Sequence, residues 1–449
     1  MPAVLEATRN LTVHILRPDT TPASLRLRVL WVSIAAVAML AATSLLMARA
    51  QDQVRVIGGE AAPQAATASD LYFALSDLDA QVARLVLIDN ADALAGTQID
   101  ALGAYRERSL QIDVDLQRAL TTATGDDDRA TVLELLNDLA VYRQWAWRAL
   151  TVESQLPPRP PGKLPPAALG YYTQATNVLH LELLPTAKRL RDASQQRLDD
   201  AYAQQRLTEA LGIGLAVLLG GGLVALLIVL QVWLARRFRR VLNPALLTAT
   251  AITLGLVVAA CAVFILEGAR LGAARRDSLE PYLALSQAQA VSYDAAADTS
   301  RYLISARLGY YREDFTRKSG CLVKGGQCGT AGDELDGGLA ALAGDQEVLD
   351  RWLGYQRDHD KIVALADSGE TAAAIDSLTG IQRGDAAFDF SYFDAAIGQI
   401  ATARKQAFDA SLRDAERLLT GWVAIPIAAM GLVLLLVPLG VRKRLREYR

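Results

Sequence analysis

Histidine, cysteine and lysine are rare in this chain, and their scarcity limits the chemistry it can perform. Only three histidines occur among 449 residues, and none of them, His14, His180 or His359, stands in a ligand or catalytic pattern. Neither a hydrolase motif nor a metal-binding spacing is present, and the glycines at 220–222 lie in an apolar run instead of after a strand. We therefore predict a protein that is not an enzyme and holds no cofactor or metal ion. Those glycines suit close helix packing.

Charged residues are absent from four long apolar runs. About 20 apolar residues of helix cross a hydrocarbon core of roughly 30 Å, so each run predicts a transmembrane helix. The lack of ionisable groups inside the runs disfavours an ion-coupled transporter. A cleaved signal peptide is the alternative for the first run, but that run exceeds the usual apolar length of about 7 to 15 residues. The four runs are residues 29–48, 211–235, 245–266 and 422–441.

Basic residues gather in three short segments beside these runs, residues 1–28, 236–244 and 442–449. Together they hold thirteen Lys or Arg and three acidic residues, although the whole chain has a net charge of −3. Short basic flanks stay in the cytoplasm, so we expect a multi-pass plasma-membrane protein with both termini cytoplasmic. The middle segment is a candidate binding site for a cytoplasmic partner, here called the basic handle, although attraction to anionic membrane lipids explains the same charge. The handle consists of Arg236, Arg237, Arg239 and Arg240.

Two long segments, residues 49–210 and 267–421, are then left outside the cell, and both are predicted to be helical. In the first, apolar residues between Leu71 and Leu85 recur at spacings of four and three, as on one face of a helix. Glycine, proline and polar breaks divide each segment into four helices. Asp126 suits a helix N-cap, with a calcium loop as the alternative. The predicted fold is an all-α membrane protein with four transmembrane helices and two extracytoplasmic domains that resemble four-helix bundles.

A shift of 217 residues lays similar residues of the two segments on one another and nearly superposes the first apolar run on the third. Because the matching residues stand at the same place relative to the membrane, we interpret the chain as a tandem duplication. The matches are Asp77, Ala80, Arg84 and Leu87 with Asp294, Ala297, Arg301 and Ile304.

The shared aspartate and arginine lie seven residues apart in each half, as Asp77 with Arg84 and Asp294 with Arg301. A solvated bundle surface is the simplest explanation. The alternative is an amino-acid or peptide site, in which arginine binds a carboxylate and aspartate binds an ammonium group. A cluster of aromatic residues and arginines could serve in the same way or contact a partner, and packing is its simpler explanation. Its candidate binding residues are Trp147 and Arg148.

Two unusual loops are predicted at the exposed ends of the bundles. Cys321 and Cys328 fit an oxidising compartment and are predicted to form a disulfide, in a loop between the first two helices of the second bundle. The other loop is the proline-rich run 157–166, which favours polyproline II. Both are either stiff connectors or rigid docking surfaces for a partner. The candidate docking residues are Pro160, Lys163 and Lys324.

The Asp-x-x-Ala-x-x-x-Arg pattern of both halves, the stretch DTSRYLI at 298–304 and the hairpin RRFRRVLNP resemble the GlnX family of actinobacterial membrane sensors. This resemblance implies that a solute-binding lipoprotein, GlnH, carries aspartate or glutamate to the outer domains. It also implies that a cytosolic Ser/Thr kinase, PknG, receives the signal. The resemblance assigns no binding residues.

Each outer domain also resembles the four-helix ligand-binding bundle of chemoreceptors, which commonly dimerise, so a homodimer is among the expected states. We therefore predict a transmembrane signal transducer that responds to amino-acid availability through its partners and the membrane lipids, with no nucleic acid involved. A structural scaffold of the cell envelope is the alternative function.

Overall fold

Helices make up almost the whole of the described chain. The computed structural model describes residues 21–88, 94–155, 164–238, 243–329 and 333–445. Its two strands, β1 (Gly326–Gln327) and β2 (Glu334–Leu335), pair antiparallel over two residues each. The all-α prediction is thus confirmed. The predictions for most of the cytoplasmic N-terminal tail and for five side chains fall outside the described residues; these side chains are those of Pro160, Lys163, Arg237, Arg239 and Arg240.

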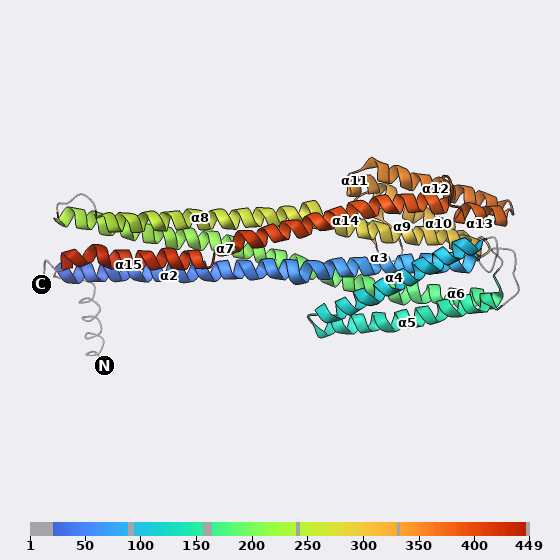
Figure 1. Cartoon of the computed structure of the whole chain (residues 1–449), viewed down its shortest axis with the longest axis horizontal. Coiled ribbons are helices and arrows are strands. Elements are labelled where there is room, and N and C mark those ends of the chain that lie inside the picture. Colours follow the sequence, from blue (N-terminus) through green and yellow to red (C-terminus); the bar gives the residue numbers. More distant parts are fainter. Residues whose placement is uncertain (1–20, 89–93, 156–163, 239–242, 330–332, 446–449) are drawn as a thin grey trace, which may run out of the picture. The chain divides into compact units, whose positions relative to one another are not determined.

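The chain forms two compact units. The first, here called the membrane unit, comprises the chain up to Val56, Ala201–Gly272 and the chain from Ser411. The second, here called the globular unit, comprises Ile57–Asp200 and Ala273–Ala410. The helices of the membrane unit are α2 (Thr21–Val56), the C-terminal part of α7 (Leu184–Phe238), α8 (Pro244–Ala274) and α15 (Ala424–Leu445) (Figure 1).

Apolar side chains both fill and cover the membrane unit. Met39, Leu227 and Val433 belong to one buried cluster contributed by its different helices. On the outside, Leu218 is 69 % exposed and Leu435 is 63 % exposed. A broad apolar exterior is unfavourable in water but matches hydrocarbon. Four helices of the chain are long and apolar enough to cross a membrane, which supports the predicted multi-pass membrane protein.

Glycine allows the helices of the membrane unit to approach closely at one position. A Cβ atom added at Gly220 of α7 would lie 2.1 Å from Cγ2 of Val257 in α8. Close packing was the interpretation of the glycines at 220–222, and it holds for Gly220. At Gly221 and Gly222 an added Cβ would meet no atom within 4 Å. These two positions therefore have room for larger side chains.

The last apolar helix is interrupted just before its predicted span. Helix α14 (Ala386–Leu419) ends where Gly421 adopts a φ of +86°, and α15 begins three residues later. Glycine tolerates this left-handed conformation better than other residues. Gln51 of α2 donates a hydrogen bond of 2.5 Å from Nε2 to the carbonyl oxygen of Leu419. The helix end is thus capped within the membrane unit by a side chain from another helix.

The globular unit draws helices from both long polar segments. Those of the first segment are η1 (Ile57–Ala61), α3 (Ala62–Ile88), α4 (Ala95–Thr122), α5 (Asp126–Ser154), α6 (Pro166–Val178), η3 (Leu179–Leu183) and the start of α7. Those of the second are η4 (Arg275–Leu279), α9 (Glu280–Ile304), α10 (Gly309–Lys324), α11 (Leu339–Ala343), α12 (Gln346–Asp367), α13 (Thr371–Thr379) and most of α14.

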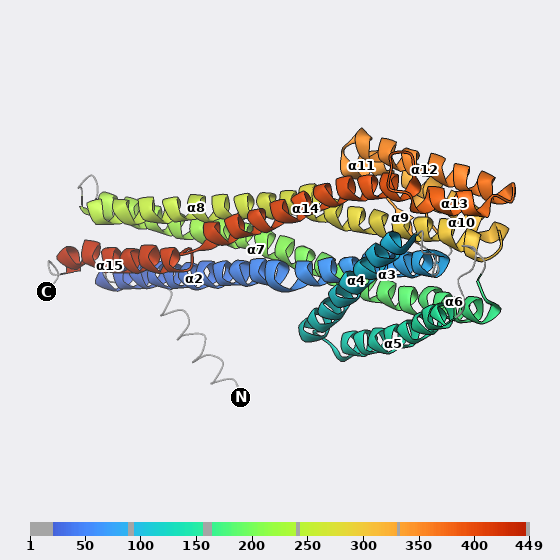
Figure 2. The same ribbon diagram turned by 45° about the vertical axis from the view of Figure 1, so that its right-hand side comes forward.

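Helices α3 and α9 pack extensively along each other (Figures 1 and 2). The predicted apolar face of α3 is buried here, including Leu71, Leu78 and Leu85. Helix α4 covers α3, and α10 covers α9. The two segments were each expected to form a separate bundle. Instead they contribute to one compact unit, because the apolar surfaces of α3 and α9 cover each other.

The second segment is divided differently from the prediction. Its first helix, α9, ends at Ile304, and Ala306 and Arg307 take positive φ angles of 54° and 72°. Neither glycine nor proline marks this turn, so no breaker signal is present in the sequence there. The cysteine loop therefore follows the second helix, α10, instead of joining the first two. Cys321 and Cys328 are bonded as predicted, but both are buried, which corrects their expected position at an exposed tip.

The two halves share a local helix distortion near the start of the globular unit. A π-helical turn, η1, precedes α3, and a π-helical turn, η4, precedes α9. They lie 218 residues apart, close to the shift of 217 that aligns the sequence pattern. Each turn inserts an extra residue into the helix and so rotates the residues that follow. This correspondence adds a structural feature to the sequence pattern behind the proposed duplication.

A candidate ligand cavity in the globular unit

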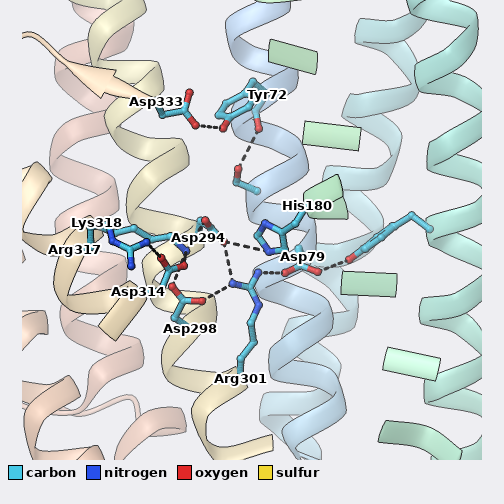
Figure 3. Close-up of polar contacts among 12 residues, drawn as sticks. Tyr72, Asp79, His180, Asp294, Asp298, Arg301, Asp314, Arg317, Lys318 and Asp333 are labelled. Carbon is cyan, nitrogen blue, oxygen red and sulfur yellow. Dashed lines mark hydrogen bonds and ion pairs between the residues drawn. The ribbon is translucent and has the colours of Figure 1, made fainter. Parts of the chain in front are cut away.

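A cavity of about 360 Å³ lies within the globular unit, among α3, α6 with η3 and α7, α9 and α10. Pockets that bind small molecules commonly have volumes of about 300 to 1,000 Å³, so this cavity is large enough for a small ligand. Its lining combines carboxylates, two cations, an imidazole and several tyrosines. The charged and ionisable residues that line it are Tyr72, His180, Asp294, Asp298, Arg301, Tyr310, Tyr311, Asp314, Lys318 and Asp333. Figure 3 shows the contacts of most of these side chains.

Arg301 of α9 lies at the centre of one end of the cavity and is only 1 % exposed. Its Nη1 donates to Asp294 at 3.0 Å and to Asp298 at 2.6 Å, and its Nη2 donates to Asp79 of α3 (Figure 3). Tyr142 of α5 donates a further hydrogen bond of 2.9 Å to Asp79. The guanidinium thus ties α9 to α3, and both its terminal nitrogens are already occupied by carboxylates.

Lys318 of α10 is the second buried cation at this end of the cavity. Its Nζ lies 2.6 Å from Asp294, 2.6 Å from Asp298 and 2.7 Å from Asp314. A buried ammonium group would normally lose its proton, but these three carboxylates raise the pKa of Lys318 above its usual value. The lysine is therefore charged, and its three hydrogen atoms have three acceptors.

Negative charge is in excess around these two cations. Four carboxylates surround them, and the further cation Arg317, 2.8 Å from Asp314, has a side chain that is 40 % exposed. Burial raises the pKa of Asp298, and the nearby charges of Asp294 and Asp314 raise it further. Burial would also raise the pKa of Asp294, but Lys318 and Arg301 hold it well below its usual value. Asp298 is therefore the carboxylate at which uptake of a proton most readily relieves the excess negative charge.

The other end of the cavity is built around Asp333. Tyr72 of α3 donates to this carboxylate at 2.5 Å, Arg191 of α7 donates at 3.1 Å and Lys188 lies 3.4 Å away. Burial and the charge of Asp333 raise the pKa of Tyr72, so its hydroxyl stays protonated. The Cys328 amide donates to the Asp333 carbonyl at 2.7 Å. The disulfide loop therefore helps to position Asp333.

His180 faces the cavity from the π-helical turn η3. Its side chain is 32 % exposed, and it makes no hydrogen bond to another described residue. The nearest charge is Asp294, whose Oδ1 lies 3.9 Å from Nε2 (Figure 3). Burial lowers the pKa of His180, so the imidazole is neutral at pH 7. It can accept or donate one hydrogen bond to a molecule in the cavity.

The two predicted Asp and Arg pairs do not form equivalent sites. Asp294 and Arg301 bind each other at the cavity. Asp77 instead accepts hydrogen bonds from Arg108 of α4 at 2.5 Å and from Gln81 at 2.9 Å. Arg84 lines a separate cavity of about 70 Å³. The same spacing thus gave two different environments, because the helices packed against α3 and α9 carry different partners.

Other predicted binding residues lie on the surface. Trp147 of α5 is 62 % exposed, and the Arg148 guanidinium lies 5.2 Å from the ring centroid of Trp145. Neither residue lines the cavity, and their roles stay predictions. Lys324 at the end of α10 and Arg236 near the end of α7 are exposed, which is compatible with the predicted docking and handle roles. The side chain of Arg237 lies outside the described residues.

Sequence reasoning missed most of the carboxylates and Lys318. A signal existed in part, because Asp294, Asp298 and Arg301 follow helical spacing on α9, as do Asp314 and Lys318 on α10. No such spacing links these residues to Asp79, His180 or Asp333. They come together only through packing of separate helices.

Residues 53–203 match the family model of the Actinobacterial sensor domain. This region covers α3 to α6 and the first part of α7, and it supplies Asp79, His180 and Arg191 to the cavity and its surroundings. No curated protein and no solved structure matches the chain significantly. Residues 53–203 are therefore similar to this sensor domain, in a chain whose described part has four candidate membrane helices.

Proposed function

We propose that the chain is a non-catalytic transmembrane sensor whose globular unit lies outside the cell and whose membrane helices carry its response inward. One observation supports this most directly: three walls of the cavity are continuations of candidate membrane helices. Tyr72 lies on the helical stretch Leu25–Ile88, His180 on Pro166–Arg236, and Asp294 with Arg301 on Pro244–Ile304. A change in the cavity would act on helices that also contribute the membrane core.

The proposed stimulus is amino-acid availability, and the proposed route includes a solute-binding lipoprotein outside and a Ser/Thr kinase inside. Support comes from the sensor-domain match and from the resemblance to the GlnX family. The short basic segments support the orientation, with both termini in the cytoplasm. In this proposal the chain signals through helix movement that a separate cytoplasmic protein reads.

Orientation is tested by labelling single cysteines in intact cells with a membrane-impermeant maleimide. Arg383 in the globular unit and Arg442 at the end of α15 are both exposed, so each can be replaced by cysteine. We expect Arg383→Cys to be labelled in intact cells and Arg442→Cys only after permeabilisation. The reverse pattern would contradict the proposed orientation.

Signalling is tested with a disulfide trap at the opposite end of the spans. A Cβ atom at Gly440 would lie 3.2 Å from Cβ of Ala245, which is close to the separation of about 3.8 Å in disulfides. The variant Ala245→Cys, Gly440→Cys, in a Cys261→Ala background, reports on α8 and α15. We expect its crosslinking rate in native membranes to change when starved cells receive glutamate or aspartate. Equal rates in all nutrient states, with correct orientation, would favour the envelope scaffold.

A further inference from the structure

We infer that the cavity of the globular unit binds an ammonium group of a small molecule directly, at the end formed by Asp294, Asp298 and Asp314. This inference rests on the proposed sensor function and names the chemistry of its ligand. The site is built into the unit, since Arg301 and Lys318 beside it are buried and hydrogen-bonded.

The bonding of the two cations argues against an anion at this end. Both terminal nitrogens of Arg301 donate to carboxylates, and Lys318 lies within 2.7 Å of three carboxylates. A ligand carboxylate would either displace one of these partners, which leaves a buried aspartate without its counter-charge, or accept from Nε of Arg301, which is buried and has no partner among the described residues. It would also approach a region that already carries excess negative charge. The arginine of this pair is therefore no free carboxylate clamp.

A ligand ammonium group would meet the opposite conditions. It adds a positive charge that balances the excess of negative charge on the surrounding carboxylates, and each of its N–H groups can donate to a carboxylate oxygen. The neutral, unbonded imidazole of His180 offers a further acceptor in one tautomer. Tyr310 and Tyr311 also line the cavity, and aromatic rings favour nearby organic cations. Carboxylates together with aromatic rings fit an ammonium ligand better than an anion or an apolar one.

Two sources of this group fit the volume. An α-amino acid would bring an ammonium group and a carboxylate, and its carboxylate could point toward the opposite end, where Arg191 and Lys188 accompany Asp333. A diamine would bring two positive charges and no carboxylate. The shared chemistry is the ammonium group, and the choice between the two sources is left to direct binding measurements.

The test uses the full chain purified in nanodiscs and isothermal titration calorimetry in phosphate buffer, which contains no amine. The probes are L-glutamate, butane-1,4-diamine and N-acetyl-L-glutamate, whose ammonium group is blocked. We expect binding of at least one of the first two probes and none of the third. Preference for glutamate identifies an amino-acid site, and preference for the diamine identifies a dication site.

Asp314 is the residue to change, because Lys318 and Arg301 keep their other partners when its charge is removed. We expect Asp314→Asn to weaken binding by at least about tenfold, since a charge a few ångströms from the ligand contributes more than about 1.4 kcal/mol. Asp314→Glu restores the charge and should keep most of the affinity. Asp376→Asn, on the exposed face of α13, is the matched control and should bind like the unchanged chain.

The inference is overturned if neither ammonium probe binds the folded chain, or if Asp314→Asn binds as tightly as the control. Circular dichroism confirms that each variant is folded. The outcome is separable from that of the proposed function. Crosslinking that responds to nutrients without direct binding would keep the sensor and remove the ammonium site. Binding without any crosslinking response would keep the site and remove the sensor.

Discussion

The two units differ in whether ionic side chains belong to the interior described for each. The interior cluster of the membrane unit is formed by leucine, valine, methionine and alanine, with Leu223 and Met430 among its members. The globular unit buries Asp298, Arg301 and Lys318 side by side. Lipid offers no water to a misplaced charge, so an uncharged interior is the stable solution there. In the globular unit, each of these three charges has oppositely charged partners.

This difference shows where the molecule can respond to small solutes. Apolar packing depends on shape, and a dissolved ion or proton hardly changes it. A buried ionic network depends on its charge balance, so a proton or a bound cation shifts its energy directly. The ionic network of the globular unit is accordingly the part of the molecule that a small solute can affect directly.

The largest expected effect comes from breaking the buried network. Arg301→Met should lower the free energy of unfolding of the globular unit by roughly 3 to 5 kcal/mol, because it leaves Asp79 and Asp298 without their main counter-charge. The matched change Arg84→Met, at the equivalent position of the other half, should cost only about 1 kcal/mol. Thermal unfolding followed by circular dichroism measures both. Equal losses would mean that the two halves use their arginines alike.

Removing the disulfide should have the next largest effect. The bridge joins residues seven apart, and a loop of that size stabilises a fold by about 2 to 3 kcal/mol. We expect Cys328→Ser to lower stability by that amount and to loosen the placement of Asp333. Cys261→Ala in α8 is the control and should leave stability unchanged within about 0.5 kcal/mol. A similar loss in both variants would contradict the role of the bridge.

The stability of the membrane unit should depend on the size and shape of its side chains instead of on their charge. Gly220→Leu places a side chain against Val257 and should destabilise the packing of α7 on α8 by about 1 to 3 kcal/mol. Gly221→Leu adds the same side chain where no atom lies within 4 Å, and it should be tolerated. Thermal aggregation of the two variants in detergent tests this. If both tolerate leucine, close packing at Gly220 is not needed.

Acid should weaken the globular unit through His359, which is buried against Phe315 and 2.9 Å from Thr299. Burial lowers the pKa of His359 from 6.5 to about 3, helped by the charge of Arg312. The unfolded chain therefore takes up a proton as pH falls below about 6.5, whereas the folded chain does not until about pH 3. This contribution to stability is full above pH 6.5 and is lost toward acid, at up to about 1.4 kcal/mol per pH unit.

The measurement is the unfolding free energy of the unchanged chain and of His359→Leu between pH 7 and pH 4.5. We expect the unfolding free energy of the variant to fall less steeply with decreasing pH, because the contribution of His359 is removed. Identical slopes in the two proteins would show that other groups account for the acid sensitivity. The comparison of slopes cancels the baseline change in stability that the substitution itself causes.

Much of the fold was readable from the sequence because it follows from local patterns. Uncharged runs of about 20 residues predicted the candidate membrane helices, and the spacing from Leu71 to Leu85 predicted the buried face of α3. The proximity of Cys321 to Cys328 along the chain predicted the disulfide. The turn after Ile304 was missed, because Ala306 and Arg307 carry no breaker signal and are held by tertiary contacts, including an Arg307 hydrogen bond to Ala366.

The sequence by itself determined which stretches are helical, which are fit for lipid and where one covalent bridge forms, since hydropathy, periodicity and short-range geometry act within a few turns of chain. Only the tertiary structure decided that Arg301 meets Asp79 while Arg84 does not. It also decided that His180, Asp314 and Asp333 line a common cavity. Those contacts depend on which helices pack against each other. A contact between residues far apart in the chain produces no periodic pattern in the sequence around either residue.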